Sequence, residues 1–280
     1  MKKVIIIAIL VLISAPLSAQ GLYRWADEKG TLHFSDSPPP DNIPKSNILS
    51  EPKAKESKQK KDGNRIIVDI YKDFYYEDSG WPFGMSAGQT RAAGMSPDPY
   101  EYISREPSYR SPKVLYGYIA LGNSDDNHFN FALDGVGTSE WDLYVDKNNN
   151  KDLTDDGPPY KNEGTGKFAA LISLEFEVIN SKRQTILQPY KFWFWIDENK
   201  RGQKSPFFYS RCHYIGQLTI DGNTHDAIAF EEKNHDGLFK ESGICIDMND
   251  DKQCDKSEQY HNGDTIKAGE KKYLLKLDYP

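Results

Sequence analysis

The chain has 280 residues, of which 35 are basic and 42 acidic, and its formal net charge is −7 at pH 7. This length suffices for one sizeable β-rich domain or two smaller units, and the 17 tyrosines and 13 phenylalanines favour strands over helices. The acidic balance argues against nucleic acid as a partner, because phosphate binding needs a basic surface.

Residues 1–19 have the parts of a secretory signal peptide. Lys2 and Lys3 form a positive start, and residues 4–13 are an unbroken apolar run that small residues follow. The run is too short for a membrane span, which needs roughly 20 residues, and no cysteine follows it that a lipid anchor would require. We therefore expect an exported chain, periplasmic or secreted and not membrane-spanning, that begins near Gln20.

Residues 20–40 are expected to form a small N-terminal domain built on a β-hairpin. Residues 22–26 and 31–35 alternate as short strands, and Gly30 suits the turn between them. Nine residues of this segment form a recognisable pattern: Tyr23, Trp25, Asp27, Gly30, His33, Phe34, Ser35, Asp36 and Pro38. At these positions the chain resembles the domain of unknown function 4124, which follows the signal peptide in many proteobacterial envelope proteins. The resemblance implies a Gram-negative envelope protein and no particular chemistry.

The segment 41–64 is poor in apolar residues and rich in Lys, Ser, Glu and Pro. Such a composition buries too little surface to offset the entropy of ordering the chain. We expect a disordered linker there.

Residues 65–280 carry repeated strand signals and no sustained helical periodicity. The expected strands are 66–71, 114–121, 129–133, 141–145, 172–178, 190–196, 214–220, 227–230 and 273–277. Many short strands joined by Gly, Asn and Asp turns predict a mainly β fold, a β-sandwich-like antiparallel domain with few helices.

A long segment with little strand signal, residues 80–112, contains the sequence GMSAG around Ser86. This matches the pattern that exposes a serine nucleophile at a strand-to-helix turn. Its context differs, because Pro82 would interrupt the preceding strand and no α/β pattern surrounds it. A hydrolase that acts on envelope polymers through Ser86 or an acidic pair is thus the alternative function, and we assign no catalytic residue.

An acidic loop follows the expected strand 141–145. Asp146, Asn148, Asn150 and Asp152 place oxygen-bearing side chains at loop positions 1, 3, 5 and 7. Calcium takes six to eight oxygen ligands, and this spacing lets a tight turn point alternate side chains inward. The loop is a candidate calcium site.

Trp193 and Trp195 share one face of the expected strand 190–196, and Phe192 and Phe194 share the other. Large aromatic stripes of this kind are more often sheet core. An exposed tryptophan face would instead be a flat platform for sugar rings or a partner protein.

The three cysteines are Cys212, Cys245 and Cys254. In an oxidising compartment the two nearest in sequence, Cys245 and Cys254, are expected to pair. That bridge would close a loop of about ten residues and stabilise the fold by roughly 2–3 kcal/mol. The alternative is three buried thiols.

The second acidic loop has the fuller pattern. Asp247, Asn249, Asp251, Gln253, Asp255 and Glu258 are its candidate ligands, and Glu258 at position 12 would close the shell. Both loops resemble the calcium loops of EF-hand and dockerin-like proteins, although strands flank them here.

Two departures separate these loops from that pattern. Position 6, usually glycine because the backbone turns left-handed there, is Lys151 in one loop and Lys252 in the other. Position 12 of the first loop is Gly157, so Asp155 or Asp156 would have to close it. A weaker third copy begins at Glu232, with Asn234, Asp236 and Gly237. The alternative for all three is a turn whose side chains bond backbone amides.

These features together favour a non-catalytic, exported binding or scaffolding protein of the cell envelope, stabilised by calcium. Its partner would be an envelope glycan or a protein.

Overall fold

The computed structural model describes three short strands near the N-terminus by their backbone alone and then most of residues 63–278. The described ranges of this larger part are 63–78, 82–83, 85, 91–92, 94–180, 183–232 and 234–278. The expected signal peptide, the turn at Gly30, Ser86 and most of the expected linker lie outside these residues.

The N-terminal strands form a small antiparallel sheet of their own. They are β1 (Tyr23–Ala26), β2 (Leu32–Ser35) and β3 (Ile48–Ser50), in the order β2-β1-β3. The pairing of Tyr23 with Ser35 and of Ala26 with Leu32 confirms the predicted hairpin. β3 falls within the range expected to be a linker and pairs with β1.

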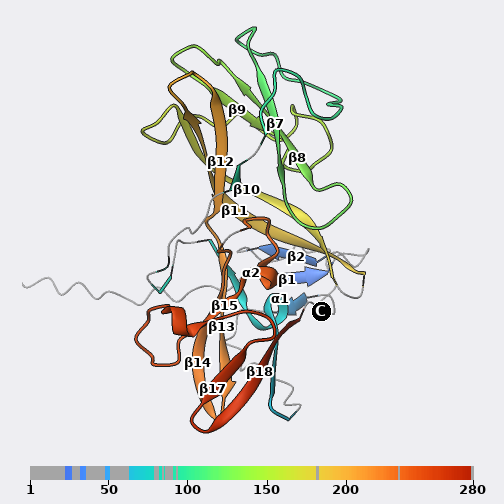
Figure 1. Ribbon diagram of the computed structural model, residues 1–280. Helices are drawn as coiled ribbons and strands as arrows, with labels where there is room; N and C mark the ends of the chain where they lie inside the picture. Colours follow the sequence, from blue (N-terminus) through green and yellow to red (C-terminus); the bar gives the residue numbers. More distant parts are fainter. Residues whose placement is uncertain are drawn as a thin grey trace, which may run out of the picture.

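The upper tier in Figure 1 is a sandwich of two sheets. One sheet, in the order β7-β8-β9, contains β7 (Leu115–Ala120), β8 (His128–Asp134) and β9 (Asp142–Val145). The other, in the order β10-β11-β12-β6, contains β6 (Arg91–Ala92), β10 (Phe168–Ile179), β11 (Thr185–Glu198) and β12 (Lys204–Ser210). Phe131 of β8 meets Phe194 of β11 with ring centroids 5.3 Å apart, so the apolar faces of the two sheets pack on each other.

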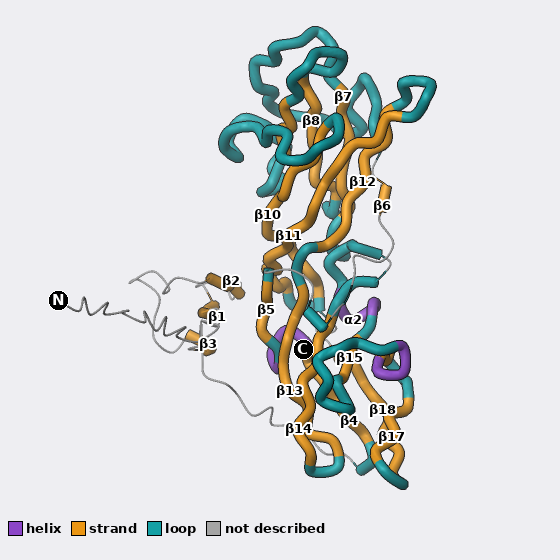
Figure 2. The backbone as a smooth tube through the Cα atoms, turned by 90° about the vertical axis from the view of Figure 1, so that its left-hand side faces the viewer, coloured by secondary structure: helices purple, strands orange, loops and turns teal. Residues whose placement is uncertain are grey.

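The lower tier contains a five-stranded antiparallel sheet and a three-stranded sheet (Figure 2). The first, ordered β16-β15-β14-β13-β5, comprises β5 (Tyr75–Glu77), β13 (His213–Ile220), β14 (Asn223–Ala229), β15 (Ile244–Ile246) and β16 (Gln259–Tyr260). The second, ordered β17-β18-β4, comprises β4 (Arg65–Asp69), β17 (Thr265–Ala268) and β18 (Lys271–Asp278). β4 and β18 run parallel, so the first and last strands of this part of the chain pair with each other.

Helices are few and short, as the sequence predicts. Among the described residues they are α1 (Ile70–Asp73), α2 (Phe239–Ser242) and the 3₁₀ turn η2 (Lys256–Glu258). The expected strand 66–71 ends two residues early, because α1 begins at Ile70 and the Asp73 carboxylate accepts the Asp69 N–H at 2.9 Å.

One hydrophobic core joins the two tiers. Phe239 of α2 lies between Tyr190 of β11 and Tyr214 of β13, with centroid distances of 6.4 and 5.1 Å. These three residues belong to the same buried cluster as Phe131 and Phe194. The loops that leave β9 and β15 are therefore attached to a continuous, packed framework.

Candidate functional site

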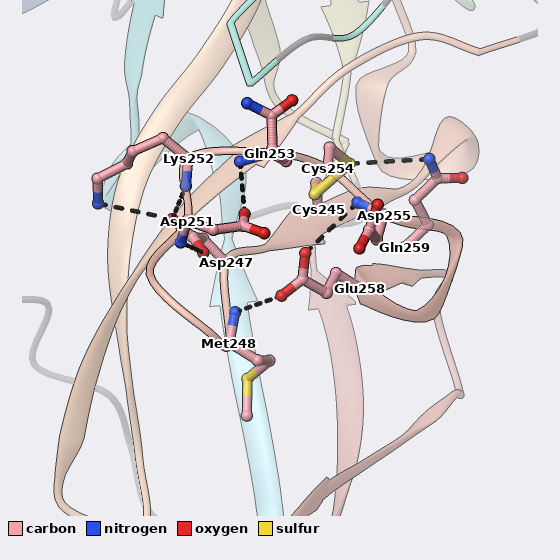
Figure 3. The surroundings of a disulfide bond; sticks show 10 residues. All are labelled: Cys245, Asp247, Met248, Asp251, Lys252, Gln253, Cys254, Asp255, Glu258 and Gln259. Atoms are coloured by element: carbon pink, nitrogen blue, oxygen red, sulfur yellow. Dashed lines mark hydrogen bonds and ion pairs between the residues drawn. A yellow bond between two sulfur atoms is a disulfide. The ribbon is translucent and has the colours of Figure 1, made fainter.

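The Asp247 loop, defined here as residues 247–258, starts where β15 ends (Figure 3). Asp247 is 1% exposed, and its two carboxylate oxygens accept the backbone N–H groups of Asp251 at 3.1 Å and Lys252 at 3.2 Å. The Asn249 side-chain oxygen also accepts the Asp251 N–H, and the Asp251 carboxylate accepts the Gln253 N–H at 2.8 Å. Each oxygen-bearing residue at positions 1, 3 and 5 thus organises the turn that follows it.

Glu258 closes the Asp247 loop. One of its oxygens accepts the Met248 N–H at 2.9 Å, and the other accepts the Asp255 N–H at 3.4 Å as part of the capping box of η2. Carboxylate oxygens of Asp247, Asp251 and Glu258 lie within 4.8 Å of one another. Among the described residues, they are the one such group of three acidic, histidine or cysteine side chains that could hold a metal ion.

The other candidate ligands of this loop lie outside the group of three carboxylates. Asp255 caps η2 and is outside the group of three, and the Gln253 side chain is exposed. The Asn249 amide donates to Asp251 at 3.0 Å, which keeps its oxygen beside the carboxylates. Asn249, Gln253 and Asp255 therefore stay predicted ligands of this loop.

Lys252 supplies a positive charge that the sequence pattern treats only as a departure. Its ammonium lies 2.9 Å from Asp226 of β14 and 3.5 Å from the buried Asp247 carboxylate. Its hydrogen bonds to Asp250 and Asp226 raise the pKa of Lys252, so it stays protonated. In the sequence, the recurrence of lysine at position 6 of both loops is the feature that indicates this charge.

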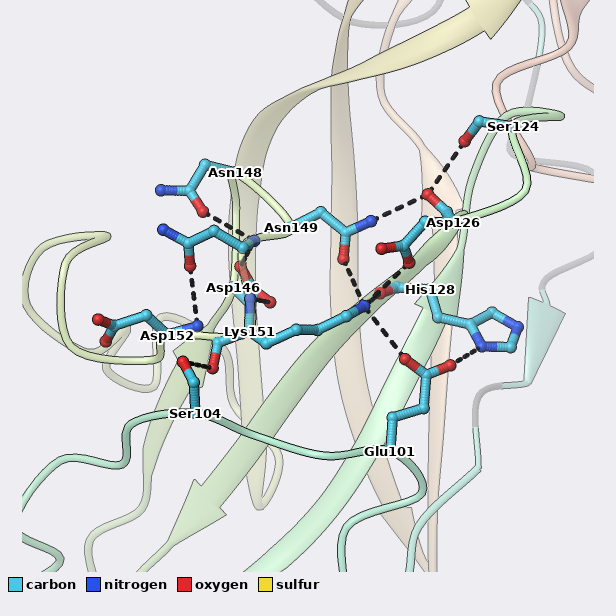
Figure 4. Close-up of polar contacts among 11 residues, drawn as sticks. Glu101, Ser104, Ser124, Asp126, His128, Asp146, Asn148, Asn149, Lys151 and Asp152 are labelled. Carbon is cyan, nitrogen blue, oxygen red and sulfur yellow. Dashed lines mark hydrogen bonds and ion pairs between the residues drawn. The ribbon is translucent and has the colours of Figure 1, made fainter.

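The Asp146 loop, residues 146–156, repeats the same hydrogen bonds (Figure 4). Asp146 is fully buried and accepts the N–H groups of Asn150 at 3.0 Å and Lys151 at 2.9 Å. Asn148 accepts the Asn150 N–H at 3.1 Å, and Asn150 accepts the Asp152 N–H at 2.8 Å.

The two loops also share their backbone conformation. Positions 4 and 6 have positive φ in both: 54° at Asn149 and 67° at Lys151, 60° at Asp250 and 58° at Lys252. The left-handed turn expected at position 6 is therefore present even though the residue is lysine.

Asp156 closes the Asp146 loop by accepting the Lys147 N–H at 2.9 Å, as Glu258 does for Met248. Asp155 accepts the Asn150 amide at 2.7 Å, whereas Asp152 turns away and pairs with Arg105 at 3.5 Å. Burial raises the pKa of both Asp146 and Asp156.

A polar network holds the outside of the Asp146 loop (Figure 4). The Lys151 ammonium pairs with Asp126 at 2.9 Å and Glu101 at 3.1 Å, and Glu101 also bonds His128. Partial burial lowers the pKa of Lys151, but the hydrogen bonds to Asp126 and Glu101 outweigh it and the net shift is upward. The Ser104 N–H and hydroxyl both donate to the Lys151 carbonyl, so the segment 101–105 fastens this loop in place.

The third acidic turn uses a different carboxylate from the one expected. Glu231, not Glu232, accepts the Gly237 N–H at 2.5 Å and the Tyr190 hydroxyl at 2.6 Å. His235 and Gly237 have the positive φ values of positions 4 and 6, and a side chain at Gly237 would collide with Phe176. Glu231 is fully buried, and this burial raises its pKa to about 7. Its carboxyl group lies inside the core.

The catalytic alternative depends on residues 80–112. Ser86 lies outside the described residues, so its role stays a prediction. The described part of this segment forms a groove of about 580 Å³ against β7, lined by Pro97, Glu106, Tyr109, Ser111, Pro112 and Tyr116 among others. Glu106 accepts the Tyr116 hydroxyl at 2.6 Å, and burial raises the pKa of Tyr116 to about 12, so that hydroxyl is a weak acid.

Cys245 and Cys254 lie at disulfide distance, with their Cα atoms 6.0 Å apart, which confirms the expected pairing (Figure 3). Cys212 is free and buried, and burial raises its pKa. The bridge joins β15 to the loop interior and so encloses Asp247, Asn249 and Asp251.

Comparison with known proteins finds a match for the N-terminal segment alone. The family model of a domain of unknown function, DUF4124, matches residues 9–61, which include the β1-β2 hairpin. No curated protein and no solved structure matches the chain. Among the described residues, no helix has both the length and the apolar character to cross a membrane.

Proposed function

We propose that the chain is a non-catalytic, exported binding or scaffolding protein of the cell envelope, and that calcium bound at the Asp247 loop stabilises its β domain. The observation that supports calcium is the group of Asp247, Asp251 and Glu258, whose oxygens lie within 4.8 Å. Three carboxylates so close repel one another, and a divalent cation relieves that repulsion.

The chemistry of this group suits a hard cation. It offers three carboxylates and the neighbouring Asn249 amide oxygen, and calcium prefers oxygen ligands of this kind. Lys252 neutralises part of the charge from the outside, so we expect moderate affinity. The Asp146 loop has fewer carboxylates and is the weaker second site.

Export is supported by the N-terminal signal pattern and by the cysteine pair, because disulfides persist in oxidising compartments. Fractionation of the native host should find a mature chain that begins near Gln20 in the periplasm or the medium. A full-length cytoplasmic product would contradict this part of the proposal.

Calcium binding is tested by thermal unfolding and calorimetry of the mature protein. When free calcium exceeds the dissociation constant 100-fold, binding to the native state alone stabilises it by about 2.7 kcal/mol. Glu258→Gln keeps an oxygen for the Met248 N–H and removes the closing charge, so it should lose most of this gain.

The matched control is Asp255→Asn, which changes a carboxylate in the same loop but outside the group of three. It should keep the calcium response of the parent. An unchanged melting temperature and no binding heat at millimolar calcium would show that both loops are only hydrogen-bonded turns.

A further inference from the structure

The solvent side of β11 carries an aromatic surface that the calcium loops do not use. Phe192 and Phe194 are fully buried, whereas Trp193 and Trp195 alternate with them and are only partly buried. The tryptophans therefore belong to the outer face of the sandwich and not to its core. An outward tryptophan face is the alternative that the sequence allows, since such aromatic stripes are more often sheet core.

The pairing of β11 with β12 adds two more aromatic residues to this surface. Trp193 lies opposite Tyr209, and Trp195 lies opposite Phe207. The rings of Trp195 and Phe207 are stacked at 5.6 Å with an interplanar angle of 24°, and Tyr209 meets Trp195 edge-on at 5.6 Å. The four aromatic residues are thus neighbours on the outer face of the sheet, and we call this surface the Trp193–Trp195 platform.

A small-residue turn leaves a groove along one edge of this platform. Ala169 of β10 is the partner of Trp195, and a side chain at Gly164 would come within 2.8 Å of the Ala169 Cβ. The resulting groove has a volume of about 480 Å³ and is lined by Thr165, Gly166, Trp193, Trp195, Asp197 and Tyr209 among others. Bulky residues at positions 164 or 169 would fill it.

The turn above the groove is already ordered. The Asn162 side-chain oxygen accepts the N–H groups of Gly164 at 3.1 Å and Ala169 at 2.9 Å, and its amide donates to the Gly166 carbonyl at 3.3 Å. A ligand therefore meets a preformed groove and has little ordering cost to offset.

The rim of the groove offers several hydrogen-bonding groups. Among the described residues, no hydrogen-bond partner faces the indole N–H of Trp193 or Trp195, or the side chains of Thr165 and Asp197. Neighbouring cations are already engaged: Lys167 and Lys204 with Glu198 at 3.4 and 3.3 Å, and Lys191 with Asp78 at 3.0 Å.

We propose that this groove binds a neutral, extended glycan whose pyranose rings stack on Trp193 and Trp195. The apolar C–H face of a pyranose covers a flat aromatic ring, and its hydroxyls can bond the indole N–H, Thr165 and Asp197. An apolar peptide would leave those polar groups without partners, which is costly. An anionic polymer would meet the Asp197 carboxylate in the lining of the groove. The inference rests on the proposed binding role and does not depend on calcium.

The test is titration of the mature protein with neutral hexasaccharides of β-1,4-linked N-acetylglucosamine, β-1,4-linked glucose and α-1,4-linked glucose. Binding should quench or blue-shift tryptophan fluorescence and release heat in calorimetry. Trp195→Ala should weaken binding at least tenfold, whereas Trp195→Phe, which keeps an aromatic ring, should lose less. The control Tyr102→Ala removes an aromatic side chain that is 80% exposed elsewhere and should bind like the parent.

Two outcomes would overturn the proposal: a folded parent that binds no probe at millimolar concentration, or a folded Trp195→Ala variant that binds as tightly as the parent. Circular dichroism establishes folding for each variant. Because the groove shares no residue with the Asp247 loop, titrations below the melting temperature should give the same affinity with calcium and with chelator. If the parent binds a glycan but does not respond to calcium, only the metal proposal is rejected. If it responds to calcium but binds no glycan, only the glycan proposal is rejected.

Discussion

The Asp146 and Asp247 loops have the same backbone and different closures. Each begins with a buried aspartate that accepts two N–H groups, and each has a lysine with positive φ at position 6. The Asp247 loop is closed by Glu258 and fastened by a disulfide, which leaves three carboxylates close together. The Asp146 loop replaces one of those carboxylates with Asn150 and is fastened by Lys151 and the segment 101–105.

Acidic turns can have two roles: their carboxylates can build the turn, or they can bind a cation. Carboxylates that accept backbone N–H groups build the turn, and every one of the three acidic turns does this. Carboxylates gathered close together are what a cation would use, and the described residues gather three of them only in the Asp247 loop, where each also accepts a backbone N–H. The same sequence signature can thus mark a structural turn or a candidate metal site.

The largest effect on stability is expected from the third turn, where the Glu231 carboxyl group is fully buried. Burial raises the pKa of Glu231 from the ordinary 4.5 to about 7. The folded chain therefore holds this proton more tightly than the unfolded chain, so the group stabilises the fold below pH 4.5 and the contribution is lost as the pH rises through about 7. The shift corresponds to roughly 3 kcal/mol between these limits.

Glu231→Gln should remove that pH dependence. Glutamine can still accept the Gly237 N–H and bond the Tyr190 hydroxyl, so the variant is expected to fold. Urea unfolding at pH 4.5 and pH 8 should show the parent losing roughly 3 kcal/mol more than the variant. Glu232→Gln, a change at the neighbouring residue, should behave like the parent. Equal pH dependence of parent and Glu231→Gln would mean that Glu231 titrates normally.

A smaller effect should follow from exchanging position 5 between the two loops. Asp251→Asn gives the Asp247 loop the residue of its counterpart, and Asn150→Asp does the reverse. Both residues accept the N–H two positions later, so either change keeps the turn. We expect calcium affinity to fall roughly tenfold in the first variant and to rise roughly tenfold at the Asp146 loop in the second, because ligand charge sets affinity. Calorimetry that gives unchanged affinities in both would show that position 5 is not a ligand.

Local patterns in the sequence predict the local parts of this comparison. The oxygen side chains at positions 1, 3 and 5, the left-handed position 6 and the cysteine pair all depend on neighbours within ten residues or so. The lysine partners do not: Asp126 and Asp226 lie 25 and 26 residues before Lys151 and Lys252. Only the pairing of β8 with β9, and of β14 with β15, brings them together.

The fold divides in the same way. Alternation in β10 predicts that strand, and a run that is apolar on both faces predicts β11. The run cannot tell which face of β11 is inside, because Phe and Trp are both large and apolar. β12 escapes prediction because Pro206 and the adjacent Phe207 and Phe208 break the alternation, although it pairs with β11 along its whole length. Its outward Phe207 and Tyr209 complete the platform that the sequence only suggests.

The smallest effect tests how each loop tolerates lysine at position 6. A positive φ costs a non-glycine residue roughly 1 kcal/mol, so glycine there relieves strain in both loops. The Lys252 side chain is 53% exposed, and ion pairs of exposed side chains contribute little to stability. Lys252→Gly should therefore leave the stability of the calcium-free protein unchanged or raise it slightly. The Lys151 side chain is only 21% exposed and joins Glu101 to Asp126, so Lys151→Gly should lower stability by about 1 kcal/mol despite the relieved strain. Urea unfolding of the two variants in chelator measures their free energies of unfolding. Equal values would mean that the Lys151 network stabilises the fold no more than the exposed Lys252 pairs do.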